Sequence, residues 1–137
     1  MNFSLAVDLR RYFYITGGTF TDESERQKTA SVLDIKTLDQ WSLPHLNIGR
    51  SDHSSIILMN HLFVFCGFSS QKRIENSIEG LDLLLESFWY TLTLGNSTLT
   101  FGQSAISSIS STKFVVYGGG SAYYDNNLSN FVVDLKT

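Results

Sequence analysis

YFYITGG, residues 12–18, is an apolar run that ends in a pair of glycines. The arrangement returns as HLFVFCG at residues 61–67 and as KFVVYGG at residues 113–119. The ends of the three runs are separated by 49 and then by 52 residues. A period near 50 residues predicts that one structural unit occurs about three times in the chain.

Two further residue types keep this period. Asp34, Asp82 and Asp134 each close a short apolar segment (VLD, GLD and VVD), and they lie 48 and then 52 residues apart. Trp41 and Trp89 are also 48 residues apart. Coincidence in an unrelated β-protein is the alternative, but three residue types that share one period favour a true repeat.

The order of these residues resembles the kelch repeat, and the resemblance covers nearly the whole chain. The best match begins at residue 12 and continues through Trp41, Pro44, Arg50 and His53-Ser54. The second unit matches less well, because a cysteine replaces its first glycine and no proline or arginine follows its tryptophan. The third unit ends with the chain, before any tryptophan strand.

The resemblance implies an all-β fold, a partial kelch-type β-propeller of about three four-stranded antiparallel blades. We expect a single incomplete propeller over residues 1–137, with blade units at about 1–46, 47–95 and 96–137. Propellers close with about four to eight blades. We therefore expect either a piece of a longer kelch protein, or self-association, or a partner that completes the ring.

Short apolar runs between turn-rich segments predict strands rather than helices. The first strands of the units are expected at 3–7, 54–58 and 104–109, and the glycine-terminated runs are the second strands. The third strands are expected at 30–35, 77–83 and 130–135, and the fourth strands carry Trp41 and Trp89. Residues 81–85 (LDLLL) are the segment for which a helix stays an alternative.

The repeated glycines have a structural interpretation. A chain that leaves a buried strand in a sharp turn needs a positive φ, which glycine adopts without a Cβ clash. The glycines concerned are Gly17, Gly18, Gly67, Gly118 and Gly119. A phosphate-binding loop at residues 118–120 is the alternative, but it would need a following helix.

The repeated aspartates and tryptophans are also interpreted as architecture. Asp34, Asp82 and Asp134 are expected to hydrogen-bond to turns, because a catalytic acid is needed once rather than three times. Trp41 and Trp89 are expected to be apolar wedges between neighbouring blades. Stacking of an exposed tryptophan on a ligand is the alternative.

Metal and nucleophile chemistry find little support in the sequence. His45, His53 and His61 are spaced by eight residues, but no cluster of cysteines or carboxylates completes a coordination shell. His53 resembles the histidine of the kelch pattern and is expected to be a hydrogen-bonded structural residue. Cys66 lies in an apolar strand, where a buried thiol is the usual state. We expect no metal and no cofactor.

The antiparallel order of strands places the longest connections on one face. These connections cover residues 19–28, 43–52, 69–76, 95–100 and 120–127. Loops on a rigid scaffold carry most binding residues, and Arg50 and Asp52 are the first candidates for partner contacts. Tyr123 and Tyr124 are further candidates, as aromatic anchors. The alternatives are that Arg50 braces loops and that the tyrosines pack on the next blade.

Composition restricts the partners. The net charge of −3 offers no basic field for nucleic acid or a membrane surface. A single cysteine among 137 residues and no visible signal sequence favour the cytoplasm. We therefore expect a protein-interaction module without catalysis, whose partner the sequence does not identify.

Two alternatives to this function stay open. One is a propeller-type carbohydrate-active enzyme that resembles an oxidase or a sialic-acid isomerase. The former would need copper ligands with a nearby cysteine, and the latter would need several converging arginines. The other alternative is a truncated, non-functional fragment.

Overall fold

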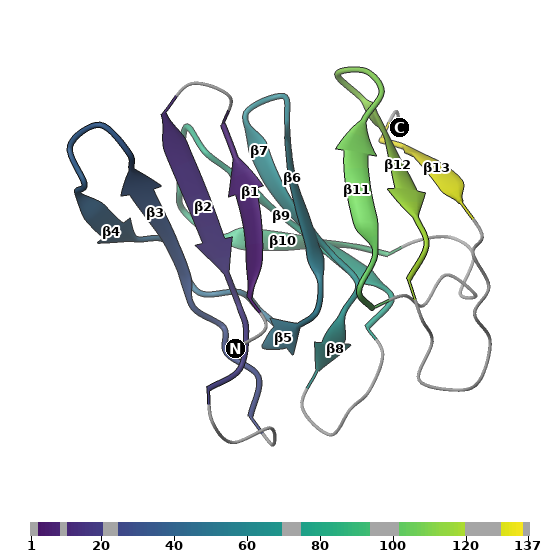
Figure 1. Ribbon diagram of the computed structural model, residues 1–137, viewed down its shortest axis with the longest axis horizontal. Coiled ribbons are helices and arrows are strands. Elements are labelled where there is room, and N and C mark those ends of the chain that lie inside the picture. The colour runs from purple at the N-terminus through teal and green to yellow at the C-terminus, as the bar shows by residue number, and fades with distance from the viewer. Residues whose placement is uncertain are drawn as a thin grey trace.

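The structure is a computed structural model that describes residues 3–8, 11–20, 25–69, 75–93, 102–119 and 130–135. These residues form an all-β fold of several antiparallel sheets, two with four strands, one with three and one with two (Figure 1). The all-β prediction is confirmed. The described sheets do not close into a ring. No helix among the described residues could span a membrane.

Each large sheet is a chain-order meander of neighbouring strands. The first sheet contains β1 (Ser4–Val7), β2 (Tyr12–Thr16), β3 (Ala30–Asp34) and β4 (Gln40–Ser42). The second contains β6 (Ser54–Leu58), β7 (His61–Phe65), β9 (Ser77–Asp82) and β10 (Trp89–Thr93). The third contains β11 (Ala105–Ser108), β12 (Lys113–Tyr117) and β13 (Phe131–Asp134), while β5 (Arg50–Ser51) pairs with β8 (Phe68–Ser69).

The predicted strands agree with these bounds to within one or two residues. The segment 81–85, for which a helix was the alternative, completes β9 at Asp82 and then turns. The small pairing of β5 with β8 was not predicted. Both strands have two residues, too short for any hydrophobic periodicity.

Two apolar cores join the three large sheets face to face. β1, β6 and β11 lie side by side along the molecule (Figure 1). The first core joins the first and second sheets and contains Ala6, Tyr14, Ala30, Val32, Leu43, Leu46, Leu62, Val64, Leu81 and Trp89. The second joins the second and third sheets and contains Leu58, Phe63, Phe65, Cys66, Ile78, Phe114, Val116 and Val133. The second sheet is therefore covered on both faces, which accounts for its nearly continuous apolar strand at 61–65.

The turn after the second strand has the same backbone conformation in all three units. Its first residue has φ of 58° at Gly17, 55° at Cys66 and 62° at Gly118. A Cβ at Gly17 would overlap the carbonyl oxygen of Arg50, in the segment that leads to the second sheet. The positive φ predicted for the glycine pairs is confirmed, and Cys66 adopts it despite its side chain.

The two tryptophans are not equivalent, which corrects the prediction that both are wedges. Trp41 is opposite Val32, whereas Trp89 is opposite Leu81, one place further along the repeat. The β9–β10 turn has one more residue than the β3–β4 turn, and a one-residue shift moves a side chain to the other face. Trp89 is 4% exposed between two sheets, but Trp41 is 39% exposed and contacts Tyr12 edge to face.

The aspartates at the ends of the third strands hold the turns that follow them. Asp34 Oδ1 accepts hydrogen bonds from two backbone N–H groups of the β3–β4 turn, at 2.9 and 3.4 Å. Asp82 Oδ1 does the same in the β9–β10 turn, at 2.8 and 3.3 Å. Asp134 instead lies 3.2 Å from Lys113 Nζ on the neighbouring strand. The turn hydrogen bonds predicted from the repeat are thus present at Asp34 and Asp82.

Alanine substitutions at two equivalent glycines separate the steric role of the turn from its backbone strain. Gly118→Ala introduces only an unfavourable φ, because its Cβ meets no atom within 4 Å among the described residues, and we expect a loss of about 1 kcal/mol. Gly17→Ala adds the overlap with Arg50, and we expect a loss of about 3 kcal/mol or more. Urea denaturation of dilute protein measures both. Equal losses would contradict the close approach at Gly17.

Candidate functional site

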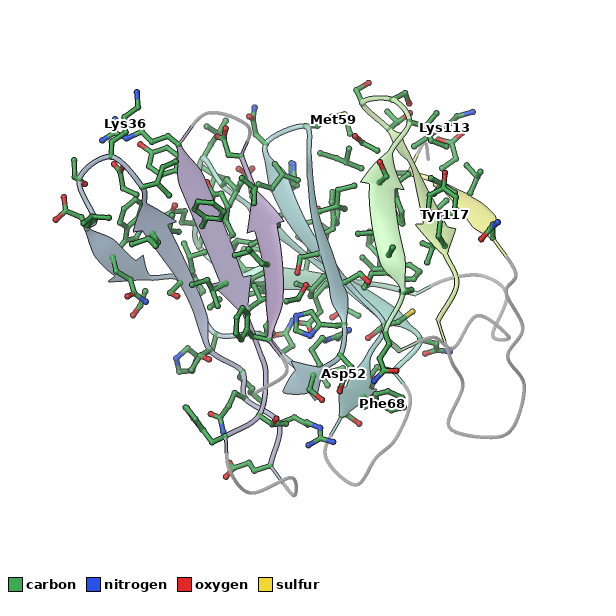
Figure 2. All side chains as sticks on the ribbon, in the orientation of Figure 1. Lys36, Asp52, Met59, Phe68, Lys113 and Tyr117 are labelled. Carbon is green, nitrogen blue, oxygen red and sulfur yellow. The ribbon has the colours of Figure 1, made fainter. Side chains whose placement is uncertain are left out.

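The long connections of the fold emerge on one side of the sheets, here called the loop face. It comprises the described residues of the β2–β3 connection, the β4–β5 connection, β5 and β8, at the bottom of Figure 1. Asp52 and Phe68 lie on this side in Figure 2, whereas Lys36, Met59 and Lys113 mark the tight turns on the opposite side. The predicted placement of the long connections on one face and of the tight turns on the other is therefore confirmed for these segments.

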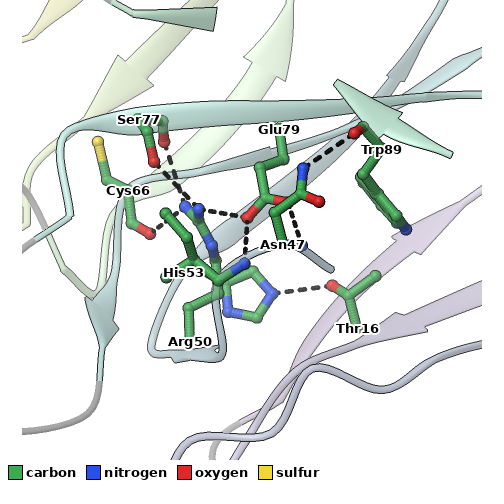
Figure 3. A network of polar contacts seen from close by, with 9 residues as sticks. Thr16, Asn47, Arg50, His53, Cys66, Ser77, Glu79 and Trp89 are labelled. Atoms are coloured by element: carbon green, nitrogen blue, oxygen red, sulfur yellow. Dashed lines mark hydrogen bonds and ion pairs between the residues drawn. The ribbon is translucent and has the colours of Figure 1, made fainter. Parts of the chain in front are cut away.

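Arg50 is a fully buried cation at the base of the loop face (Figure 3). Its Nη1 donates to the carbonyl oxygens of Cys66 and Ser77, at 2.9 and 3.1 Å. Its Nη2 donates to Ser77 Oγ at 3.1 Å and to Glu79 Oε1 at 2.7 Å. The guanidinium thus binds the end of β7 and the start of β9 together.

Glu79 connects this cation to the β4–β5 connection. Its Oε2 accepts from the backbone N–H of Asn47 at 2.6 Å, and its Oε1 accepts from that of Ile48 at 3.1 Å. The Asn47 side chain in turn donates to the carbonyl oxygen of Trp89 at 2.9 Å, and Trp89 Nε1 donates to that of Pro44 at 2.7 Å. The carboxylate therefore fixes the backbone of a connection that lies more than 30 residues away in sequence.

The burial of Arg50 corrects its assignment as a partner-contacting residue. Its side chain has no exposed surface, so it does not contact a partner on the loop face, and the alternative that it braces loops fits its hydrogen bonds. Asp52 is half-buried and contacts the segment that leads to the third sheet, since its carbonyl oxygen accepts from Gln103 N at 2.8 Å. Tyr123 and Tyr124 lie outside the described residues.

His53 is a buried neutral histidine between the first and second sheets. Its Nε2 hydrogen-bonds with Thr16 Oγ1 at 2.8 Å, which agrees with the structural role expected for it. Burial, together with the nearby charge of Arg50, lowers the pKa of His53 to about 3. His61 lies elsewhere, stacked on Phe63. No group of three potential metal ligands occurs among the residues that the structure describes.

A pocket of about 320 Å³ lies on the loop face between the β2–β3 and β4–β5 connections. It is lined by Glu25, Arg26, Gln27, Lys28, Thr29, His45 and Gly49. The backbone sets its shape, because Leu46 N donates to Lys28 O at 2.8 Å and a Cβ at Gly49 would overlap the backbone of Arg26. Lys28 and His45 are exposed and give the pocket cationic and hydrogen-bonding groups.

Sequence reasoning missed two parts of this site. The pocket was missed because it arises where two connections from different parts of the chain meet. Glu79 was also missed, although a signal was present: it is a charged residue in the otherwise apolar or small segment SIEGL. A buried carboxylate requires a cation and hydrogen-bond donors, so this glutamate predicts a buried partner.

Comparison with known proteins adds no relative. No protein-family model matches the chain, and no curated protein matches it either. The candidate site is therefore argued from its own geometry.

Two methionine substitutions test the buried ion pair. Arg50→Met keeps most of the apolar stem but leaves Glu79 buried without its cation, and we expect a loss of about 3–5 kcal/mol in unfolding free energy. Arg11→Met is the matched control, since Arg11 pairs with Asp34 at a partly exposed site. We expect a much smaller loss there. Urea denaturation compares the two losses in unfolding free energy. A loss for Arg50→Met as small as the loss for Arg11→Met would show that the buried pair is dispensable.

Stability should fall in mildly acidic solution because of His53. Its folded-state pKa lies below its unfolded value, so between about pH 6.5 and 3 only the unfolded chain binds this proton. The contribution is present above pH 6.5 and is lost as the pH falls, with a slope of up to about 1.4 kcal/mol per pH unit. Urea denaturation between pH 7.5 and 5 measures it. His53→Gln should flatten the profile, and an unchanged slope would assign it elsewhere.

Proposed function

We propose that this chain is a protein-interaction module whose loop face recognises a partner protein, without catalysis of its own. The observation that carries the proposal is the loop face itself. The β2–β3 and β4–β5 connections meet there around a pocket, and Glu79, paired with Arg50, holds the backbone of the β4–β5 connection in place. Rigid support of this kind lowers the entropy cost of binding.

We also propose that the three large sheets are blades of a kelch-type β-propeller. The support is their common plan: meandering strands in chain order, the first strands side by side, and faces packed against each other. The shared backbone conformation at Gly17, Cys66 and Gly118 supports a true repeat as well. Such units bury their faces only by stacking on neighbours.

The chemistry of the loop face suits a protein partner. Phe20 is 62% exposed in the β2–β3 connection, and Phe68 is half-buried in β8. The loop face therefore offers apolar aromatic area at Phe20 and polar or charged side chains at Lys28 and His45, a composition that is common at protein interfaces. The net charge of −3 does not favour nucleic acid or a membrane surface as the partner. A cytoplasmic location stays a prediction.

No specific observation favours the carbohydrate-active enzyme. An isomerase-like site would need arginines free to bind a carboxylated sugar, but Arg50 is committed to Glu79. An oxidase-like copper site would need an accessible cysteine, but Cys66 is fully buried. A truncated, non-functional fragment is the remaining alternative, and it predicts no specific partner.

Site-specific photocross-linking tests the proposed function. A photoreactive amino acid at Lys28 reports contacts on the loop face, and the same amino acid at the exposed Lys36 reports contacts on the opposite face. We expect protein adducts at position 28 and few at position 36. His45→Glu should reduce the adducts at position 28, because it places a negative charge in the wall of the pocket.

Equal labelling at both positions, or no protein adduct at position 28, would contradict the proposal. Turnover of an oxidisable or sialylated sugar by the purified chain would favour the enzyme instead.

A further inference from the structure

The two faces of each large sheet have different neighbours. Alternate side chains of a strand point to opposite faces. In the second sheet, Leu62, Val64 and Leu81 belong to the face that packs against the first sheet, here called the back face. Phe63 and Phe65 belong to the opposite face, the front face, which packs against the third sheet. Every internal contact between large sheets therefore joins a front face to a back face.

No other large sheet among the described residues packs on the back face of the first sheet. The central back-face side chains of the second and third sheets are at most 8% exposed, namely Leu62, Val64, Leu81, Phe114, Val116 and Val133. The first sheet has Phe13, Ile15 and Leu33 at equivalent positions, and these are only half-buried. Leu5 and Val7 beside them are each 45% exposed. The equivalent apolar back faces of the second and third sheets are each covered by the front face of the preceding sheet.

The front face of the third sheet is partly exposed. Tyr117 and Val132 on this face are 48% and 58% exposed, whereas Val115, opposite Val132, is 9% exposed. Gly118 has the same positive φ as Gly17, whose Cβ position is filled by the segment leading to the next sheet. Around Gly118 no atom among the described residues fills that position within 4 Å. The third sheet thus has the turn conformation that precedes another sheet elsewhere in the chain, and no described sheet packs on its front face.

We propose that two copies of this chain associate head to tail, with the front face of the third sheet of each copy packed on the back face of the first sheet of the other. We choose a second copy as the partner because each chain carries one exposed front face and one exposed back face. Front and back faces already pack together twice within the chain, between the first and second sheets and between the second and third. The inference goes beyond recognition of a partner and rests on the proposed propeller arrangement of the sheets.

Closure follows from the symmetry of such a pair. Contacts between unlike faces form a ring when the rotation between copies closes. The described residues of each copy form three large sheets, so two copies supply six, which lies within the range of about four to eight blades for closed propellers. The pair therefore contains two identical contacts, and each described outer sheet face is covered by the other copy.

Sedimentation velocity and native mass spectrometry over a range of protein concentrations test the proposal. We expect the wild-type chain to have twice its monomer mass. Leu5→Glu disrupts the back face and Val132→Lys disrupts the front face, and each variant alone should be a folded monomer. Leu84→Glu, at a 77% exposed site in the β9–β10 turn, is the control and should stay dimeric.

Mixing the two variants distinguishes unlike faces from a symmetric contact. A pair of one Leu5→Glu chain and one Val132→Lys chain retains one intact contact and gains opposite charges at the other, so a mixed dimer should reappear. A folded wild-type monomer, open polymers, or no mixed dimer would overturn the proposal. Photocross-linking at Lys28 is read independently of mass, so failure here does not decide the proposed function.

Discussion

One buried ion pair, Arg50 with Glu79, links the second sheet to the connection that reaches it from the first. Neither side chain has exposed surface, and a buried pair is tolerated only when further hydrogen bonds satisfy it. Arg50 obtains these from two carbonyl oxygens and a hydroxyl, and Glu79 obtains them from two backbone N–H groups. Because these groups belong to β7, β9 and the β4–β5 connection, the pair positions the second sheet relative to the loops that reach it from the first.

The sequence predicted the strands well because each unit repeats an apolar run with a glycine turn and an apolar segment closed by aspartate, and the first two units share a tryptophan as well. It predicted the tryptophans less well, because the face of Trp41 depends on one residue in a turn, which a period near 50 residues does not resolve. Arg50 matched the expected residue type, but a matched type does not reveal burial. Its burial became evident only with Glu79, which lies 29 residues away.

The polar contacts between sheets show why the units stack in one direction. Thr16 at the end of β2 hydrogen-bonds with His53 and Ser55, which belong to the next unit. Ser54 hydrogen-bonds with Ser104 in the unit after that. The first strands of neighbouring sheets therefore meet through small hydroxyl side chains, while larger apolar side chains fill the space further out. Small residues where the first strands meet and large ones in the cores are what the proposed stacking of wedge-shaped sheets would require.

The shape of the pocket is linked to the buried ion pair by backbone hydrogen bonds. Its wall at Lys28 is joined to the β4–β5 connection through the hydrogen bond from Leu46, and that connection is in turn joined to Glu79 through Asn47. Loss of the buried pair would therefore remove the hydrogen bonds that hold the β4–β5 wall of the pocket. Under the proposed function, substitutions at the buried pair would change the fraction of molecules with a correctly shaped loop face, whereas substitutions at the pocket would change the contacts with the partner.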